Sequence, residues 1–546
     1  MGSPGNDASL PTTASTGERT VLGRRTVLTG AAAGAAAVLV DTRPAHANTI
    51  RTDPFALGVA SGDPLRWSVI LWTRLVGAGA APLSGRDVDV RWEVATDPHF
   101  RRVVRRGVAR ARGSLAHSVH VEAFGLQPGR DHWYRFKVGS YVSPAGRTRT
   151  APAPWARPSS LRLAVANCQD FQNGYYPAYA GLADEGVDVV LHLGDYIYEY
   201  DAHSAFADRN HSATQTPGLD QLRTLADYRA RHAQYKGDPA LQAAHLSAPW
   251  IATWDDHEVE NNYAGLVDEI DDTGAKHQTV AEFAAQRAAA YQAYWEHMPI
   301  RAHLRPGSPD LRIFRRFDFG DLLRVSVLDT RQYRTDQPGN HSLDFGPESD
   351  GTSNTAGTLT GEDQERWLKR QLVTSHAHWN VVAQQVMMSR TRFPDFTFSG
   401  LPFIKNLDQW DGYTPQRQRL LQFIADRGVR NPVVLAGDIH SSWFSDLKLN
   451  FDDTASHAVA SEYVATSITS DFPIAFDAPI KTWNPFLNPH VKFFDGSLRG
   501  YLRMDVNRQR WLTEQRSVAS IATRTSPVTT TAAFATESGV PGVVRA

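Results

Sequence analysis

Four short apolar runs in this chain each end in a cluster of polar residues. The runs cover residues 161–166, 187–193, 248–254 and 432–436, and stretches with a helical pattern separate them. Strands that alternate with helices are typical of a layered α/β domain, in which functional side chains follow the carboxyl ends of the strands. The pattern therefore predicts an α/β domain over residues 161–510, with its functional site at the strand ends.

The polar clusters hold side chains that bind metal ions or exchange protons. They are the segments Asn167 to Asp170, Asp195 to Glu199, Asp255 to Asn262, and Asp438 to His440. Each fragment alone is a weak signal, because an aspartate at a strand end commonly caps the following helix. Together they indicate bound metal, since carboxylates that converge at one end of a sheet resist ionisation unless cations neutralise them. Two metal ions are favoured over one.

The only cysteine in the chain is Cys168, so no internal disulfide can form. A lone cysteine is commonly a small buried apolar residue. Cys168 lies where an apolar strand opens into a loop, whereas a cysteine that only packs would sit earlier, inside the strand. This position favours a metal ligand.

The first 47 residues have the features of an export signal. The pair Arg24-Arg25 precedes a weakly apolar stretch over residues 29–40, and Ala45 and Ala47 form a small-x-small end. This order is typical of a twin-arginine signal peptide cleaved after Ala47. We therefore expect the twin-arginine translocase as a partner during export, and a secreted or cell-wall-associated protein. The alternative is a disordered N-terminus with a chance Arg-Arg pair.

Residues 51–154 and 511–546 differ from the central domain. Residues 51–154 contain short runs of alternating polar and apolar residues, separated by turn signals. Such runs predict a small β-sandwich, and the Pro/Ala-rich stretch over residues 150–160 is the expected linker. Residues 511–546 are expected to form a loosely ordered C-terminal tail or a final surface strand.

The overall charge balance indicates which classes of binding partner to expect. The chain has 546 residues, with 57 basic and 58 acidic side chains and a formal net charge of -1. This balance excludes a polybasic nucleic-acid coat, and we expect no specific nucleic-acid partner. No window holds the roughly 20 uninterrupted apolar residues of a transmembrane segment.

Five motifs, in this order, resemble those of the PhoD alkaline phosphatases, which are relatives of the calcineurin-like metallophosphoesterases and purple acid phosphatases. The motifs are Asn167–Asp170, Gly194–Glu199, Trp254–Glu258, Leu328–Arg334 and Gly437–His440. The resemblance covers nearly the whole chain after the signal, from Phe55 to about Asp495. It implies a four-layer αββα metallophosphoesterase sandwich preceded by a small fibronectin- or Ig-like β-sandwich domain.

Three positions depart from the wider metallophosphoesterase pattern and agree with the PhoD group. Cys168 replaces an Asp-x-His pair, Asp256 replaces an Asn before the His, and Asp438 replaces a first His. The resemblance to the PhoD group implies iron plus calcium. Donor chemistry agrees, because a thiolate and a phenolate suit Fe³⁺ whereas carboxylate and amide oxygens suit Ca²⁺.

The predicted ligands divide between the two kinds of ion. We assign Cys168, Tyr198 and His440 to one Fe³⁺, and Asp195 as a bridging carboxylate. We assign Asp256, Asn262 and Asp438 to one or more Ca²⁺, with Asp255 and Asn261 as adjacent alternatives of the same chemistry. A tyrosine bound to Fe³⁺ would give the protein a visible charge-transfer band.

The hypothetical reaction is attack on phosphorus by a metal-activated hydroxide or oxo group. Arg331 is a candidate phosphate clamp, because its guanidinium can bind two phosphoryl oxygens at once. The alternative is a structural pair with Asp329 or Asp336. His257 is predicted either to protonate the leaving oxygen or to order the surroundings of the ligands.

Three functions fit these residues. The first is a monomeric, exported, metal-dependent alkaline phosphatase that hydrolyses small phosphomonoesters and phosphodiesters. The second uses the same Fe/Ca site as a phospholipase D acting on phospholipid head groups, since some secreted actinobacterial phospholipases D also resemble this family. The third is a non-catalytic surface-binding protein in which the metals are structural.

Overall fold

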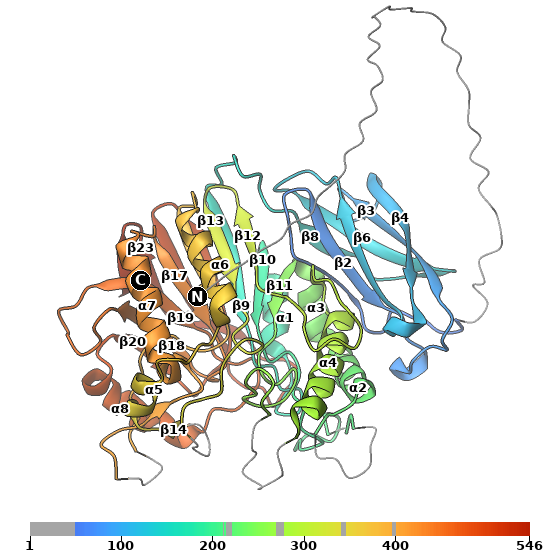
Figure 1. Ribbon diagram of the computed structural model, residues 1–546. Coiled ribbons are helices and arrows are strands. Elements are labelled where there is room, and N and C mark those ends of the chain that lie inside the picture. Colours follow the sequence, from blue (N-terminus) through green and yellow to red (C-terminus); the bar gives the residue numbers. More distant parts are fainter. Residues whose placement is uncertain (1–49, 211, 215–220, 269–277, 340–344, 396–399) are drawn as a thin grey trace, which may run out of the picture. The chain divides into compact units, whose positions relative to one another are not determined.

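The computed structural model describes residues 50–210, 212–214, 221–268, 278–339, 345–395 and 400–546 (Figure 1). The predicted export signal over residues 1–47 lies outside these ranges. Within them, none of the helices has the length and apolar character that crossing a bilayer requires.

The larger sheet has ten strands in the order β24-β23-β22-β21-β9-β10-β11-β1-β2-β5. Their bounds are β1 Val59–Gly62, β2 Ser68–Arg74, β5 Ser118–Phe124, β9 Ser160–Ala166, β10 Val189–Leu193, β11 Trp250–Thr253, β21 Arg499–Asn507, β22 Arg510–Val518, β23 Val528–Glu537 and β24 Val540–Arg545. β10 pairs in parallel with both β9 and β11. Three of the four predicted strands are therefore confirmed as neighbours whose carboxyl ends lie at one edge of the sheet.

The smaller main sheet has seven strands in the order β12-β13-β15-β17-β19-β18-β20. Their bounds are β12 Arg315–Phe319, β13 Leu323–Val327, β15 Trp379–Ala383, β17 Pro432–Ala436, β18 Ser442–Lys448, β19 Ala458–Val464 and β20 Val491–Asp495. β13, β15, β17 and β19 run parallel. The fourth predicted strand is β17, and the apolar run that precedes Arg331 contains β13.

The eight described helices lie outside these two sheets. They are α1 Pro177–Asp184, α2 Leu225–Lys236, α3 Pro239–Ser247, α4 Val280–His297, α5 Glu348–Ser353, α6 Gly361–Val373, α7 Thr414–Asp426 and α8 Asp477–Leu487. Capping boxes begin α2 and α4. The Thr224 and Thr279 side chains accept from the backbone N–H of the third helical residue, and the carboxylate of that residue accepts from the backbone N–H of the threonine. A two-stranded ribbon joins β14 Phe345–Gly346 to β16 Lys405–Asn406.

Alternating side chains hold the layers together. Leu163 of β9 and Val433 of β17 lie in one apolar core between the two sheets. Ala164, the next residue of β9, lies in the outer core with α1 to α4, and Val434, the next residue of β17, lies in the outer core with α6 and α7. Because successive strand residues point to opposite faces, this gives the order helix, sheet, sheet, helix that the αββα prediction required (Figure 1).

Five strands of the N-terminal region form a further sheet, which packs against the β2–β5 end of the larger sheet. This sheet contains β3 Val88–Ala95, β4 Val103–Ala111, β6 Asp131–Val138 and β7 Tyr141–Val142, with β8 Gly146–Arg149 paired to β6. Val90 and Phe136 of this sheet share an apolar core with Val69 and Val121 of β2 and β5. The region is thus two packed sheets, while its fibronectin- or Ig-like character stays a prediction.

Three strands of the predicted N-terminal domain, residues 51–154, lie in the larger sheet. β1 pairs in parallel with β11 through Gly62 and Trp250, so β1, β2 and β5 extend the larger sheet. This pairing joins residues far apart in the chain, and a local pattern of alternation carries no information about it. The N-terminal region therefore contributes directly to the sheet that carries the strand ends.

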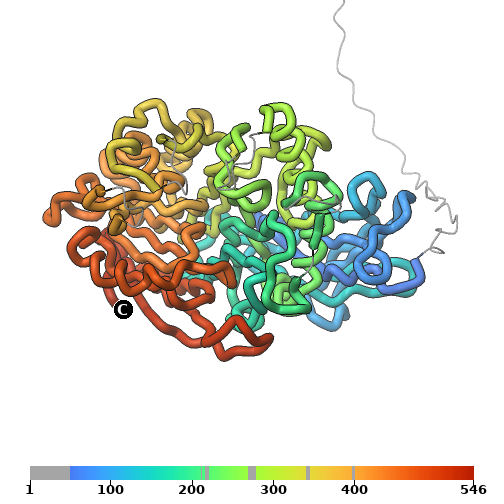
Figure 2. Tube along the Cα trace, turned by 90° about the horizontal axis from the view of Figure 1, so that it is seen from below, coloured from blue at the N-terminus to red at the C-terminus, as the bar shows by residue number. Residues whose placement is uncertain are grey.

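Of the two alternatives for residues 511–546, the loosely ordered tail is wrong and the surface strand is closer, because the segment contains three strands. β22, β23 and β24 form one edge of the larger sheet, opposite the edge made by β5 (Figure 2). Along β22 the alternate buried positions after Trp511 are Thr513, Gln515 and Ser517, and the strand ends at the buried Val518. Because these inward-facing side chains are polar, the strand lacks the apolar alternation by which half-buried strands are found in sequences.

Candidate metal centre

The carboxyl ends of strands from both sheets meet at one place. The backbone N–H of Cys168, after β9, donates to the carbonyl oxygen of Gly194, after β10, at 3.1 Å. A Cβ on Gly194 would lie 2.3 Å from the Cβ of Asp255, after β11, and one on Gly437, after β17, would lie 2.6 Å from the Asn167 side chain. The four predicted polar clusters are thus in direct contact, and glycine permits this approach at two points.

Five predicted site residues have left-handed backbone conformations. The φ angles are +53° at Cys168, +55° at Asp195, +49° at Asn262, +66° at Asp438 and +54° at His440. Residues with a Cβ rarely adopt this region, and they persist there where the surrounding structure imposes it. Backbone strain is therefore concentrated at the strand ends that present these side chains.

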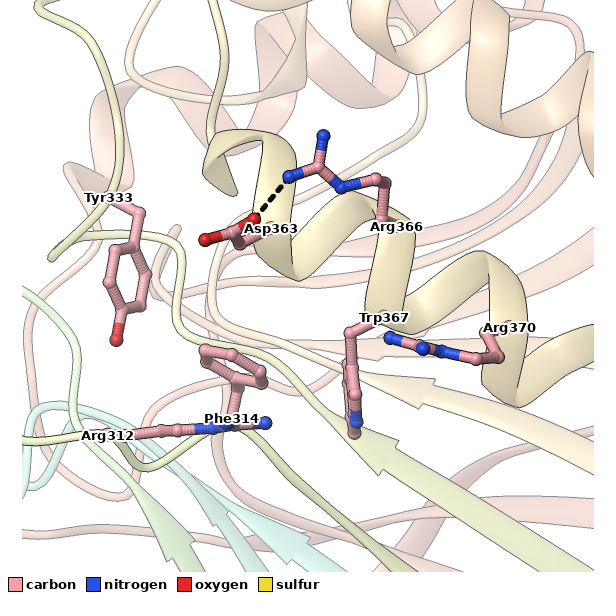
Figure 3. Close-up of a pocket in the computed structure, with 7 residues that line it drawn as sticks. All are labelled: Arg312, Phe314, Tyr333, Asp363, Arg366, Trp367 and Arg370. Atoms are coloured by element: carbon pink, nitrogen blue, oxygen red, sulfur yellow. Dashed lines mark hydrogen bonds and ion pairs between the residues drawn. The ribbon is translucent and has the colours of Figure 1, made fainter. Parts of the chain in front are cut away.

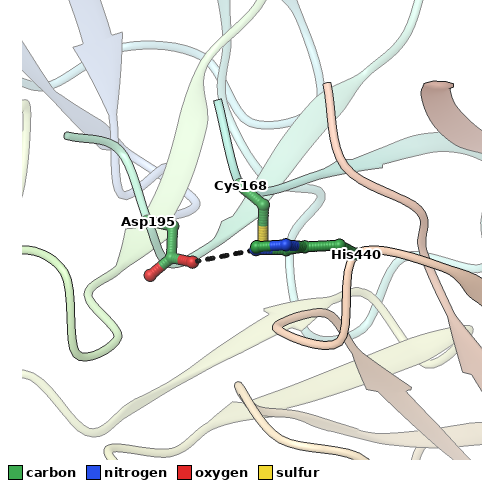
Figure 4. A group of neighbouring side chains, drawn as sticks. All are labelled: Cys168, Asp195 and His440. Atoms are coloured by element: carbon green, nitrogen blue, oxygen red, sulfur yellow. Dashed lines mark ion pairs between the residues drawn. The ribbon is translucent and has the colours of Figure 1, made fainter. Parts of the chain in front are cut away.

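The first group of potential metal ligands joins Cys168, Asp195 and His440. One ligand atom from each residue lies within 4.8 Å of the others (Figure 4). The Tyr198 hydroxyl donates to Asp195 Oδ2 at 2.9 Å and lies 3.1 Å from His440 Nε2. His440 Nδ1 lies 2.8 Å from the carbonyl oxygen of Asp471, and donation to that oxygen leaves Nε2 as a lone-pair donor. The four side chains predicted for iron therefore lie together.

Two further groups place Asp195 between the first group and an acidic one. Asp195, Asp256 and His257 form one group, and Asp255, Asp256 and Asp438 form the other, again with ligand atoms within 4.8 Å. Both adjacent aspartates, left as alternatives by the sequence, thus reach the predicted calcium ligands. Asn262 also lies here, where its backbone N–H donates to Asp256 Oδ2 at 2.8 Å, whereas the backbone N–H of Asn261 donates to Glu199 at 2.8 Å.

Burial and crowded negative charge shift several pKa values at these groups. Burial, followed by the Asp195 carboxylate, raises the pKa of the Cys168 thiol and of the Tyr198 phenol. Burial also raises the pKa of Asp438 to about 6, although Arg331 opposes this rise. Burial acts in the same direction on Asp256, but Arg331 and His257 outweigh it and lower that pKa to about 2. Thiol and phenol would therefore keep their protons at neutral pH unless a cation replaced them.

The residues present fit two different cations. Oδ1 of Asp195 and Oδ2 of Asp255 are buried and have no hydrogen-bond partner among the described residues. Because buried polar atoms are normally paired, these oxygens are free to bind an ion. A thiol, a phenol and an imidazole meet at one end of the site, and only carboxylates meet at the other, which suits a high-charge transition metal beside a hard ion.

Arg331 has a different environment from the one that the sequence favoured. Its buried guanidinium donates through Nη1 and Nη2 to Asp408 at 2.7 and 2.9 Å, through Nη2 to Asp438 at 2.8 Å, and through Nε to Asp255. Asp329 receives only the backbone N–H of Arg331, at 3.1 Å. The alternative of a side-chain pair with Asp329 or Asp336 is therefore wrong, since the other three aspartates accept from the guanidinium and a fourth, Asp256, forms an ion pair with Nη2 at 3.3 Å. Arg331 is a counter-ion of the acidic group, and its role as phosphate clamp stays a prediction.

His257 lies at the mouth of the site. With Tyr198 and His440 it lines a cavity of about 660 Å³. Its Nδ1 lies 2.7 Å from Glu199 Oε2, and its ring packs on Tyr198 at 4.1 Å between centroids. Burial disfavours the charged imidazole, but the carboxylates of Glu199, Asp256 and Asp195 outweigh burial and raise its pKa well above the ordinary value. These carboxylates therefore favour the charged imidazole of His257, which faces the cavity.

Two functional residues were missed by sequence reasoning. Glu258 accepts the backbone N–H groups of Asp195 at 3.1 Å, Tyr196 at 2.6 Å and Asp255 at 2.8 Å, so it fastens the ends of β10 and β11 together. Its place directly after His257 was the available signal. Asp408, the bidentate partner of Arg331, follows the two-residue strand β16, and no long apolar run marks it.

Replacing Gly194 with Ala should distort the site. The new Cβ would lie 2.3 Å from the Cβ of Asp255, at a φ of +114°, so we expect loss of metal content and of several kcal/mol (about 3) of unfolding free energy. Gly186→Ala is the matched control, because Gly186 also has a positive φ, +64°, but open space around it. That variant should lose only about 1–2 kcal/mol. Equal urea midpoints for both variants would contradict the close approach.

Comparison with known proteins places these residues in a known group. A family model described as PhoD-like phosphatase matches residues 163–515, and the model of its N-terminal domain matches residues 41–152. The chain is 46% identical over 491 residues to alkaline phosphatase D of Bacillus subtilis (strain 168). The aligned region covers 88% of this chain and 80% of that protein.

Solved structures agree with the sequence comparisons. A structure of PhoD superimposes with a TM-score of 0.81 at 43% identity, over 91% of this chain and 92% of that one. A purple acid phosphatase from yellow lupin (Lupinus luteus) seeds gives a TM-score of 0.50 at 11% identity, over 87% of this chain and 73% of that one. This second likeness concerns the fold alone, an α/β fold that the chain shares with that purple acid phosphatase.

Proposed function

Because the chain belongs to the PhoD-like phosphatase family and is a phosphoric ester hydrolase, we propose that it is an exported, metal-dependent alkaline phosphatase acting on both phosphomonoesters and phosphodiesters. Because this family consists of phosphatases, we no longer consider the third possibility raised by the sequence, a non-catalytic surface-binding protein. The observation that carries the proposal is the Asp195 carboxylate, which belongs to two neighbouring groups of ligand atoms. A carboxylate shared in this way is suited to hold two cations side by side.

The side chains divide by chemistry between those cations. Cys168, Tyr198 and His440 would hold Fe³⁺, and Asp195 would reach both ions. The residues for Ca²⁺ would be Asp255, Asp256, Asp438 and Asn262. When bound, the two cations would neutralise phosphoryl oxygens and lower the pKa of water.

The chain's own groups supply the remaining steps. His257 faces the cavity, and in its charged form its Nε2 can donate a proton to the leaving oxygen of a bound ester. Glu199 binds Nδ1 and so fixes the ring and the tautomer. Arg331 opposes the rise that burial causes in the pKa of Asp255 and Asp438, which favours the ionised forms that bind cations.

The direct test uses the full chain purified with its metals. At alkaline pH with calcium, p-nitrophenyl phosphate and bis-p-nitrophenyl phosphate should both release p-nitrophenol, and a chelator should stop both reactions. A preparation that contains iron and calcium but hydrolyses neither ester would overturn the proposal.

A specific surface feature favours the second candidate, phospholipase D. Asp471 lines the mouth of the site, and the segment that follows exposes Ile474, Trp483 and Phe486 by 63%, 48% and 79%. Exposed apolar side chains beside a catalytic mouth suit a lipid surface. Choline release from phosphatidylcholine at a rate comparable with phosphomonoester hydrolysis would favour this function. If no choline is released, the phosphatase function is the one supported.

Export by the twin-arginine route and a monomeric state are part of the proposal. The Arg24-Arg25 pair and the Ala45–Ala47 end support the route, and it carries folded proteins, so iron could bind the Cys168 thiol before export. The secreted protein should begin at Asn48 and sediment as a monomer. A mature N-terminus at residue 1 would contradict the export proposal.

Replacing Cys168 with Ser should remove iron selectively. A hydroxyl has nearly the shape of the thiol but is a much weaker donor to Fe³⁺, so we expect loss of iron and of the visible band while the fold is kept. Elemental analysis and an absorption spectrum are the measurements. Two matched variants identify the tyrosine responsible for the visible band. Tyr198→Phe should lose the band, whereas Tyr235→Phe should keep it. A Cys168→Ser protein that keeps iron and colour would exclude the thiol as ligand.

A further inference from the structure

A groove with two lobes lies beside β12 and α6, away from the candidate metal centre. The lobes have volumes of about 710 Å³ and 520 Å³, and Arg312, Phe314 and Trp367 line both of them. None of the residues lining the cavity at the metal centre lines either lobe. The groove is therefore a separate surface feature that the proposed reaction does not use.

Aromatic rings form the floor of the groove. Phe314 and Trp367 meet edge to face, with centroids 5.1 Å apart, and Tyr333 meets Phe314 in the same manner at 5.7 Å. The Trp367 ring is partly exposed on α6, and Figure 3 shows the Arg370 side chain reaching toward it from the next turn of the helix. Fixed rings of this kind offer a surface on which a flat ligand can stack.

Positive charge in the groove is only partly neutralised. Arg366 pairs with Asp363, Arg315 with Asp63 at 2.6 Å, and Arg316 with Asp318 at 3.2 Å. Arg312 and Arg370 are exposed and have no carboxylate partner among the described residues. Arg312 lies over the Phe314 ring at 4.2 Å instead. Two guanidinium groups are thus available to an anion, one on each side of the aromatic floor (Figure 3).

We propose that this groove binds a nucleoside phosphate, with the base stacked on Trp367 and the phosphates bound by Arg312 and Arg370. Guanidinium groups bind phosphate oxygens in pairs, and aromatic side chains stack on any base. A simple polyanion would leave the aromatic floor unused, and an apolar ligand would leave two charges without a partner. A ligand with a flat ring and an anionic tail uses both features.

The test measures binding of a nucleotide that the enzyme cannot cleave between its phosphates. The probe is adenosine 5′-(α,β-methylene)diphosphate, titrated calorimetrically into the full-length, metal-loaded protein. Inorganic phosphate is added only at the lowest concentration that stops p-nitrophenyl phosphate hydrolysis, so that it occupies the metal centre without saturating the two arginines. Wild type should bind one equivalent. Arg312→Ala/Arg370→Ala and, separately, Trp367→Leu should each weaken binding about 10-fold or more.

Controls separate the groove from general electrostatics. Arg66→Ala removes an arginine stacked at 4.0 Å on an exposed tryptophan, Trp67, outside the groove, and should bind as wild type does. Inorganic tripolyphosphate should bind more weakly than the nucleotide and should not respond to Trp367→Leu. Unchanged unfolding midpoints of the exposed arginine variants would show that the fold is kept.

Three outcomes would overturn the proposal. If the groove variants bind the nucleotide as wild type does, the nucleotide sits elsewhere. If tripolyphosphate binds as tightly and Trp367→Leu has no effect, the groove recognises charge alone. If wild type does not bind under these conditions, the groove has no such ligand. None of these outcomes affects the proposed hydrolysis, which the p-nitrophenyl esters report.

Discussion

Replacing Asp195 with Asn should reduce hydrolysis of phosphate esters by more than about 100-fold. The substitution keeps the size of the side chain and removes the negative charge that two groups of ligand atoms share. Because Oδ1 is buried without a hydrogen-bond partner among the described residues, its only favourable interaction would be with a cation. Both iron and calcium content should fall together, which elemental analysis and steady-state kinetics would show.

The matched control for this variant is Asp188→Asn. Asp188 precedes β10 at the opposite end from Asp195 and pairs with Arg149 at 3.1 Å. Its replacement removes one carboxylate charge from the same part of the fold, yet metal content and kcat/KM should stay unchanged. An Asp195→Asn enzyme with full metal content and full activity would show that the shared carboxylate is not part of the centre.

Replacing Arg331 with Met should destabilise the metal-free protein by about 3–5 kcal/mol. The guanidinium is buried and donates to Asp255, Asp408 and Asp438. Its loss leaves Asp255 and Asp438 without this counter-ion, whereas Asp408 keeps its ion pair with Arg334. Addition of calcium should reduce this loss, because cations can take over the neutralisation. Urea unfolding in the presence of chelator measures the loss of unfolding free energy without cations. The same measurement with calcium shows how far calcium reduces that loss.

This variant distinguishes the two roles considered for Arg331. A residue that only clamps phosphate would lower kcat/KM and leave the unfolding free energy unchanged in chelator. Arg366→Met is the control, because Arg366 is an exposed arginine paired with Asp363, and its stability should not change measurably. Equal stability of Arg331→Met and wild type without cations would refute the counter-ion role.

Local pattern was sufficient for the strands that carry the site. The runs before Cys168, Asp195, Asp255 and Asp438 became β9, β10, β11 and β17, because uninterrupted apolar residues followed by Gly or polar residues describe a buried strand and its end. It failed for β22, where inward-facing Thr513, Gln515 and Ser517 break the apolar alternation. It carried no information about the pairing of β1 with β11, because that contact is not local.

The kinds of chemistry at the centre were determined by the sequence alone. A thiol, a phenol, an imidazole and several carboxylates at strand ends can be read from residue types and their order, since the strands themselves define where those side chains emerge. Only the tertiary structure decided how they combine. That Asp255 joins Asp256, that Glu258 fastens two strand ends, and that Arg331 binds Asp408 are contacts between loops of different strands. They depend on how two sheets pack, and packing distances between segments so far apart in the chain are not encoded in any local pattern.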